Sequence, residues 1–188
     1  MNICILLPYK ENFSKTSAGA VSIFVNDTNK LSTFRKNIKV YGFTEDKTIL
    51  NNYINIPLKK KFFLSTSNQY LKNFIESVKN NKIDILEIHN RPHYIKKLER
   101  IKNCKKILYF HNDPLKMQGS ISIKERLYLL KKCNKIIFNS NWSKQRYLYK
   151  LGEVFNNDKL DVVHQSTSST KINFKKKQNI ISFSGKLN

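Results

Sequence analysis

Short apolar runs alternate with longer segments of helical periodicity along the chain, and this alternation restricts the fold more than any other feature of the sequence. The runs are rich in β-branched residues and are bounded by polar residues, which is typical of buried strands. We expect strands at Ile3–Leu7, Ile38–Phe43, Tyr53–Ile56, Ile83–Ile88, Lys106–Phe110, Lys135–Phe138, Leu160–Val163 and Ile180–Phe183.

Helical patterns fill the intervals between these runs. The last pattern is preceded by the capping candidates Ser140 and Asn141 and followed by Gly152. Regular alternation of strands and helices implies crossover connections. The sequence therefore predicts an α/β, Rossmann-like domain of three layers, with a mostly parallel sheet and helices on both faces. We expect helices at about Gly19–Arg35, Asn68–Asn80, Tyr94–Lys102, Ser122–Lys132 and Ser143–Leu151.

Two related pentapeptides end two successive predicted strands. The first is Ile-His-Asn-Arg-Pro at Ile88–Pro92, and the second is Phe-His-Asn-Asp-Pro at Phe110–Pro114. Ligands of open α/β sheets bind beyond the carboxyl ends of the parallel strands, so these polar clusters point at one crevice. The sequence predicts a binding or catalytic site there, lined by His89, His111 and Gly19.

The second pentapeptide carries the stronger candidate residue. His111 ends a predicted buried strand, and Asn112 and Asp113 follow it. Their side chains can orient an imidazole or a sugar hydroxyl by hydrogen bonding. A lone strand-end histidine is more often structural than functional, so the functional interpretation of His111 depends on these neighbours.

The first pentapeptide supports two interpretations. His89, Asn90 and Arg91 can contact a ligand, because the planar guanidinium of Arg91 suits a phosphate or carboxylate group. Alternatively, Asn90 and Pro92 only turn the chain from the strand into the next helix, a position that favours proline.

A loop of small residues, Ser17–Ala20, opens the first predicted helix. Gly19 in this loop would place free backbone N–H groups and a helix N-terminus beside the crevice, which suits phosphate or sugar oxygens. The phosphate-loop and dinucleotide-binding glycine patterns are both missing from the sequence. Binding of nucleoside triphosphates and dinucleotides is therefore disfavoured.

The chain is strongly basic, with 35 Lys and Arg against 13 Asp and Glu, for a formal net charge of +22. This charge suits nucleic acid, anionic membranes or phosphorylated ligands, but a general bias toward Lys, Asn and Ile explains it as well.

Cys4, Cys104 and Cys133 form neither a disulfide framework nor a metal motif. We expect a cytoplasmic protein, without a signal peptide or membrane span and without a bound metal.

The segment Lys59–Leu64 joins three lysines to Phe62 and Phe63. Such a segment can attach to anionic lipid headgroups, which would place the protein at the inner face of the cell membrane. The alternative is a solvated lysine cluster followed by two buried phenylalanines.

A polar stretch, Thr167–Lys177, precedes the last apolar run. A linker followed by one new strand indicates a domain boundary. We expect a Rossmann-like domain at 1–177 and the first strand of a second domain at 178–188. The alternative is that this strand is an edge strand of the first sheet.

Together, these segments resemble the N-terminal half of a glycosyltransferase of family 4, a two-domain, retaining enzyme of the GT-B type. A single glycine, Gly19, stands where the family usually has a pair, and Gln118 stands where an arginine is usual. The segments that carry the resemblance are Leu7–Pro8, Ser17–Ala20, Asp84–Pro92, Phe110–Pro114 with Met117–Ser120 and Glu125–Arg126, Ile136–Ser143 and Phe183–Asn188.

The resemblance implies a role for each candidate residue. His111 would lie near the transferred sugar and position the donor without acting as a nucleophile. Lys186 would neutralise the departing diphosphate, a large electrostatic contribution to such a transfer. The remaining donor- or acceptor-binding residues would be Gly19, His89, Asn90, Arg91, Asn112 and Asp113.

The function implied is transfer of a sugar from a nucleotide-sugar, with retention, to a lipid-linked or polysaccharide acceptor in lipopolysaccharide or other cell-envelope glycan synthesis. No metal or cofactor is expected, and the 188 residues alone, without the donor half, would be inactive. The alternative is a non-catalytic basic module that binds nucleic acid or a phosphorylated polymer. Aromatic residues among basic ones favour it, but no nucleic-acid-binding motif is present.

Overall fold

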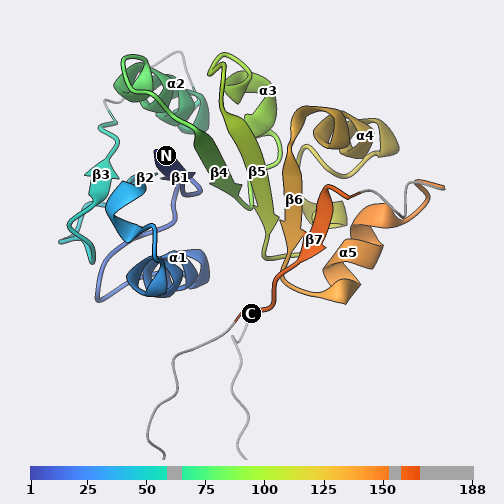
Figure 1. The fold of residues 1–188 in the computed structure, drawn as a ribbon, viewed down its shortest axis with the longest axis horizontal. Helices are drawn as coiled ribbons and strands as arrows, with labels where there is room; N and C mark the ends of the chain where they lie inside the picture. The colour runs from blue at the N-terminus through green and yellow to red at the C-terminus, as the bar shows by residue number, and fades with distance from the viewer. Residues whose placement is uncertain (59–64, 153–157, 166–188) are drawn as a thin grey trace, which may run out of the picture.

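The protein is represented by a computed structural model that describes residues 1–58, 65–152 and 158–165. These residues form a seven-stranded sheet of order β3-β2-β1-β4-β5-β6-β7, in which all neighbouring strands run parallel (Figure 1). The strands are β1 (Ile3–Leu6), β2 (Ile38–Gly42), β3 (Tyr53–Asn55), β4 (Ile85–His89), β5 (Lys105–Phe110), β6 (Lys135–Phe138) and β7 (Leu160–Val162).

Helices cover both faces of the sheet. α1 packs on one face, where Val21 and Val25 meet Ile5 and Val40. Helices α2 to α5 pack on the other face, in the larger core cluster. Their bounds are α1 (Ala20–Leu31), α2 (Thr66–Val78), α3 (Tyr94–Leu98), α4 (Ile123–Lys132) and α5 (Asn141–Leu148), with short 3-10 helices at Arg35–Asn37 and Pro114–Lys116.

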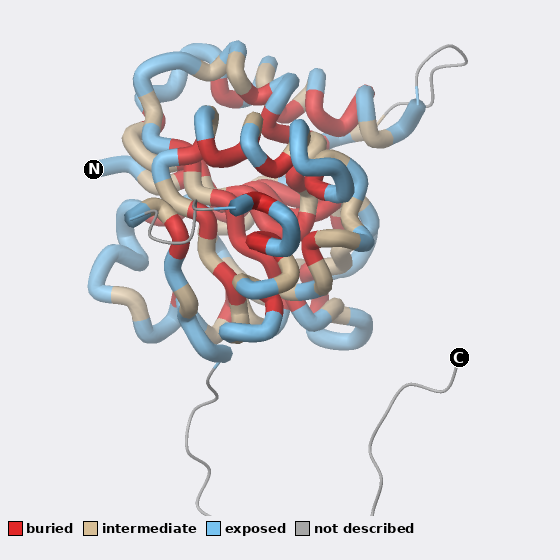
Figure 2. The backbone as a smooth tube through the Cα atoms, turned by 90° about the vertical axis from the view of Figure 1, so that its right-hand side faces the viewer, coloured by how far each residue is buried: buried red, intermediate tan, exposed pale blue. Residues whose placement is uncertain are grey.

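The core follows from the alternation of side chains along the strands. In β5, Leu108 and Phe110 enter the larger cluster, whereas Tyr109 points to the opposite face. Figure 2 shows the buried positions gathered in the interior of the molecule, with exposed positions on the outer turns. The predicted fold class, a three-layer Rossmann-like α/β domain with a parallel sheet, is confirmed.

Element boundaries differ from the predicted ones by a few residues, each for a local reason. α1 ends at Leu31 instead of continuing to Arg35, because Ser32 adopts an extended conformation. α5 begins at Asn141, before the predicted start, because the Ser140 hydroxyl accepts a hydrogen bond from the Ser143 N–H and caps the helix. The predicted strand Ile180–Phe183 and the predicted domain division at 177 lie outside the described residues.

The loop between β5 and α4 is held tightly against the start of α3. Asp113 caps the 3-10 helix at Pro114–Lys116, because its carboxylate accepts the Leu115 N–H at 3.0 Å. Gly119 follows with φ +93, and a Cβ at this position would lie 2.5 Å from the backbone nitrogen of His93. A glycine is therefore required here both by its conformation and by the close approach of the two segments.

Gly119→Ala is expected to lower the free energy of unfolding more than Gly152→Ala. Both glycines have positive φ, so alanine strains either backbone by about 1–2 kcal/mol. A Cβ at Gly152 meets nothing within 4 Å, whereas one at Gly119 must displace the loop from His93. Urea denaturation of both variants measures the difference. Equal losses would show that the contact between this loop and α3 is not tight.

Candidate functional site

The two histidines of the pentapeptides lie side by side at the carboxyl ends of β4 and β5. In the parallel register His89 pairs with Tyr109, so His111 lies one side-chain position farther along the same face of the sheet. His89 Nδ1 and His111 Nε2 are 2.8 Å apart. His89 is fully buried, and His111 is half-buried. The structure thus brings together the histidines that the sequence predicts to share a crevice.

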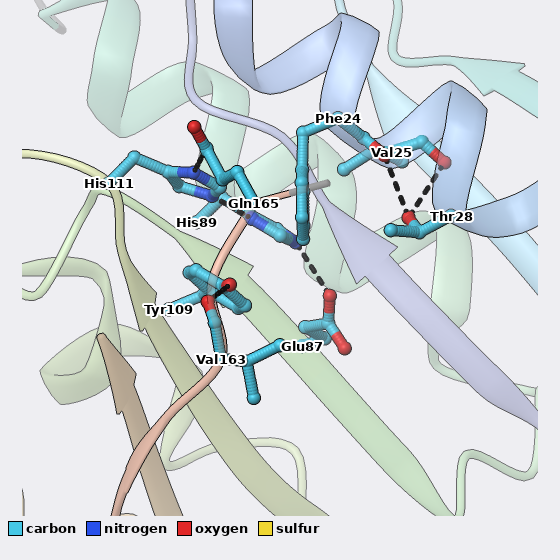
Figure 3. A network of polar contacts seen from close by, with 9 residues as sticks. All are labelled: Phe24, Val25, Thr28, Glu87, His89, Tyr109, His111, Val163 and Gln165. Atoms are coloured by element: carbon cyan, nitrogen blue, oxygen red, sulfur yellow. Dashed lines mark hydrogen bonds and ion pairs between the residues drawn. The ribbon is translucent and has the colours of Figure 1, made fainter. Parts of the chain in front are cut away.

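These histidines belong to a continuous chain of polar contacts (Figure 3). At one end, Glu87 Oε1 lies 2.7 Å from His89 Nε2. At the other end, Gln165 Nε2 lies 2.8 Å from His111 Nδ1. We call Glu87, His89, His111 and Gln165 the histidine chain. It connects two adjacent strands to the segment that follows β7.

Aromatic rings fix the orientation of both imidazoles. Tyr109 stacks on His111 with ring centroids 4.4 Å apart and planes at 17°. It also stacks on His89, at 5.5 Å and 14°. Phe24, from α1, presents an edge-on contact to His111 at 5.0 Å and 71°. The Tyr109 hydroxyl donates to the carbonyl of Val163 at 2.7 Å, which anchors the stacked ring in turn.

The backbone of His111 is held on both sides by asparagines. The Asn90 Oδ1 accepts the His111 N–H at 2.8 Å. Asn139 Nδ2 donates to the His111 carbonyl, also at 2.8 Å. Asn90 itself adopts a left-handed conformation with φ 50, which asparagine tolerates better than most residues. The buried Asn90 side chain therefore turns the chain out of β4 and positions His111 as well.

Burial keeps His111 neutral. Loss of solvation, and to a smaller extent the neighbouring His89, together lower the pKa of His111 to about 3. At neutral pH the ring therefore has one N–H donor and one bare nitrogen that accepts a hydrogen bond.

A cavity of about 450 Å³ opens beside the histidine chain, between the start of α3 and the loop that leads to α4. We call it the basic cavity. Four residues that the sequence predicts as ligand-binding line it, and they come from both pentapeptides. The lining consists of Asn90, Arg91, His93, Asn112, Asp113, Lys116, Met117 and Gln118.

The charges in this cavity do not cancel. Arg146 pairs with Asp113 through contacts of 3.1 and 3.3 Å. Burial opposes ionisation of Asp113, but the hydrogen bonds from Arg146 and the Leu115 N–H outweigh it and hold the pKa of Asp113 below its usual value. Desolvation lowers the pKa of His93, so His93 is neutral at neutral pH. Arg91 and Lys116 therefore give the basic cavity a net positive charge.

The Arg91 guanidinium lines the basic cavity and is held by the backbone. Its Nη1 donates to the carbonyl of Asn90 at 2.8 Å, which fixes one side of the guanidinium. Pro92, the residue that follows, is buried and precedes the first turn of α3. The first pentapeptide thus turns the chain from β4 into α3, as one interpretation predicts. It also places Arg91 in a cavity, as the ligand-binding interpretation predicts.

Gly19 is placed differently from the expectation of free N–H groups. Its own N–H donates to the carbonyl of Asn12 at 3.3 Å, and it precedes α1 as the capping residue. The Glu11 carboxylate accepts the Ser22 N–H at 3.0 Å, so a side chain of the protein already occupies this helix N-terminus. Gly19 does not line the basic cavity. A Cβ there would lie 2.1 Å from Glu11 Oε1, so the glycine allows that carboxylate to approach.

Two other predicted sites are not placed. Lys186, the expected diphosphate-binding residue, lies outside the described residues, and so does the predicted membrane segment Lys59–Leu64. In the described part of the chain, no helix has the length and apolarity needed to span a bilayer.

Several site residues were missed by sequence reasoning. Phe24, Asn139 and Gln165 reach His111 from distant elements, and no local pattern identifies them. Glu87 could have been predicted from the sequence, because residues two apart on a strand share a face. A carboxylate beside His89 can accept a hydrogen bond from its imidazole.

Comparison with known proteins finds similar structures but no similar sequence. No family model and no curated protein matches the sequence. The structure is similar to that of HepE from Anabaena in complex with UDP-glucose, with a TM-score of 0.56 and 9% identity over 88% of this chain. A second HepE structure, with UDP and glucose, gives 0.55 and 11% over 87%. The chain spans 44% of the HepE chain, and at these identities the similarity establishes the fold alone.

The buried, neutral state of His111 predicts a pH dependence of stability. Below pH 6.5 the unfolded chain binds a proton at this residue, while the folded state resists it down to about pH 3. The free energy of unfolding therefore falls as the pH falls through 6.5, by up to about 1.4 kcal/mol per pH unit.

Urea denaturation between pH 7 and 5 should show a shallower decline for His111→Gln than for the wild type. His164→Gln serves as the control, because His164 is exposed. If His111→Gln and the wild type decline in parallel, then His111 is protonated in the folded state.

Proposed function

We propose that this chain is the acceptor-side, N-terminal half of a retaining glycosyltransferase of the family-4 type. It would act in transfer of a sugar from a nucleotide-sugar to a lipid-linked or polysaccharide acceptor in cell-envelope glycan synthesis. The observation that carries the proposal is the fold similarity to the UDP-glucose complex of HepE across 88% of the chain. The positions of His89, His111 and the basic cavity at the carboxyl edge of the sheet support it, because α/β folds bind ligands at this edge.

In this proposal His111 contacts the sugar that is transferred. Its ring is neutral, held in one orientation by Tyr109 and Phe24, and reaches the sheet edge at the end of β5. A fixed hydrogen-bonding group lowers the entropic cost of orienting the sugar for attack. A donor domain would supply the nucleotide pocket, and Lys186 is proposed to neutralise the diphosphate that departs.

The basic cavity is proposed to bind an ionised group of the acceptor. Arg91 offers a planar set of donors that suits phosphate or carboxylate, and Lys116 adds a second positive charge. A lipid-linked acceptor with a phosphate group, or an acidic polysaccharide, has this chemistry. An acceptor on an anionic membrane would also benefit from the proposed lipid contact of Lys59–Leu64.

Transfer assays test the proposal directly. The protein, produced with any coding sequence contiguous with it, is expected to consume a UDP-sugar in the presence of a lipid-linked glycan acceptor. His111→Ala should lower kcat/KM about 10–100-fold, the effect of losing one well-placed hydrogen bond. His164→Ala, at an exposed histidine, should retain wild-type activity. Salt-sensitive binding of nucleic acid, with no turnover of any nucleotide-sugar, would instead support the non-catalytic basic module.

The same assay separates the acceptor from the donor. Arg91→Gln with Lys116→Gln should raise the KM for a phosphate-bearing acceptor at least tenfold, because hydrogen bonds to charged groups contribute about 1.5–3 kcal/mol each. The KM for the nucleotide-sugar should stay the same. A matched control is Lys36→Gln with Lys82→Gln, which removes two charges around a hollow at the opposite edge of the sheet. Equal effects of both double variants would assign the binding to general charge.

A further inference from the structure

The histidine chain contains a carboxylate that has no place in the function described so far. Glu87 lies on β4, two residues before His89 and on the same face of the sheet. It contacts His89 Nε2 at 2.7 Å and does not line the basic cavity. Its side chain is 23% exposed, while its partner His89 is fully buried.

We propose that Glu87 and His89 are positioning residues that fix the tautomer of His111, so that His111 presents an unprotonated Nδ1 to its ligand. This inference rests on the proposed function for the identity of the ligand, whereas the arrangement of protons follows from the histidine chain itself.

The direction of the hydrogen bonds begins at the carboxylate. An ionised Glu87 can only accept, so the proton between Glu87 and His89 belongs to His89 Nε2. A neutral imidazole has one N–H, which leaves His89 Nδ1 bare. The contact of 2.8 Å between the two rings is then a hydrogen bond donated by His111 Nε2. His111 Nδ1 is consequently the bare nitrogen.

The contact at the opposite end of the chain agrees with this direction. The Gln165 amide nitrogen, a donor, lies 2.8 Å from His111 Nδ1. Had His111 carried its proton on Nδ1, two donors would face each other there. The Glu87 end of the chain therefore assigns the tautomers, and the position of the Gln165 amide is compatible with the one assigned to His111.

The packing around the rings prevents the alternative arrangement from forming by rotation. Tyr109 stacks on both imidazoles, and Phe24 closes on the edge of His111. A ring flip of His89 would have to occur in a fully buried position. The tautomer is thus determined by the acceptor at Glu87 and by rings that cannot rotate freely.

A bare Nδ1 selects the chemistry of the ligand at this point. Gln165 is exposed, and a ligand that displaces it must supply a hydrogen-bond donor of its own. A neutral hydroxyl can donate, whereas an ionised phosphate or carboxylate only accepts and would face the lone pair of the nitrogen. Glu87 thereby separates the roles of the site: His111 takes hydroxyl groups, and the basic cavity takes the ionised group.

Imidazole nitrogen NMR of the 188-residue chain labelled with ¹⁵N tests the assignment. In the wild type at pH 7.5, His111 should show a protonated Nε2 and an unprotonated Nδ1, and His89 should show the same pattern. This spectrum needs no variant. A proton on His111 Nδ1, or a doubly protonated His89, would overturn the proposal.

Two substitutions at Glu87 then test the cause. Glu87→Leu removes the acceptor, so the protons of both rings should redistribute and a population of His111 with Nδ1–H should appear. Glu87→Gln is the matched control, because its carbonyl oxygen still accepts from His89 Nε2 and should restore the wild-type pattern. An unchanged His111 tautomer in a folded Glu87→Leu variant would show that Glu87 does not determine it.

Kinetics distinguish this proposal from the proposed function. In the transferase assay, Glu87→Leu should lower kcat about tenfold or more and leave the acceptor KM unchanged, with Glu87→Gln closer to wild type. Loss of activity in both variants alike would contradict a role that depends on the tautomer. If the NMR pattern is as predicted and no nucleotide-sugar is turned over, the proton arrangement stands and the transferase assignment fails.

Discussion

The geometry of the candidate site depends on the parallel pairing of β4 with β5. This register sets His89 opposite Tyr109 and leaves His111 at the next position on the same face. A slip of one residue would move every side chain of one strand to the opposite face and would separate the two imidazoles. The pairing is specified by the buried residues on the other face, where Leu86, Ile88 and Leu108 have no exposed surface. Core packing on one side of the sheet thus holds the polar chain on the other.

Asn90 connects the two halves of the site. Its side chain accepts the His111 N–H, and the residue also lines the basic cavity, while its left-handed backbone follows the last residue of β4. The two regions differ in electrostatics although they adjoin. Burial makes the region of His111 neutral, whereas Arg91 and Lys116 leave the cavity positive. A ligand with hydroxyl groups near one end and an ionised group near the other would match both.

The sequence predicts the fold closely, because the apolar runs and helical patterns record burial directly. It also predicts that His89 and His111 lie at one place, since both end adjacent strands of a parallel sheet, and they are in contact although neither lines the basic cavity. The expectation for Gly19 fails in part, because the Glu11 carboxylate occupies the helix N-terminus that was expected to be free. Contacts between distant elements, such as Gln165 with His111, depend on the path of the chain after β7, which no local pattern encodes. Glu87 is the exception, because its spacing of two residues from His89 on one strand predicts that both side chains lie on the same face.

In the proposed function, His111 contacts the sugar of a nucleotide-sugar at the carboxyl edge of the sheet. A crystal structure of the protein, produced with any coding sequence contiguous with it and bound to a UDP-sugar, would show whether this contact exists. We expect a sugar hydroxyl about 3 Å from His111 Nδ1, in the place of the Gln165 amide. A sugar bound at the amino edge of the sheet, or held with no contact to His111, would contradict it.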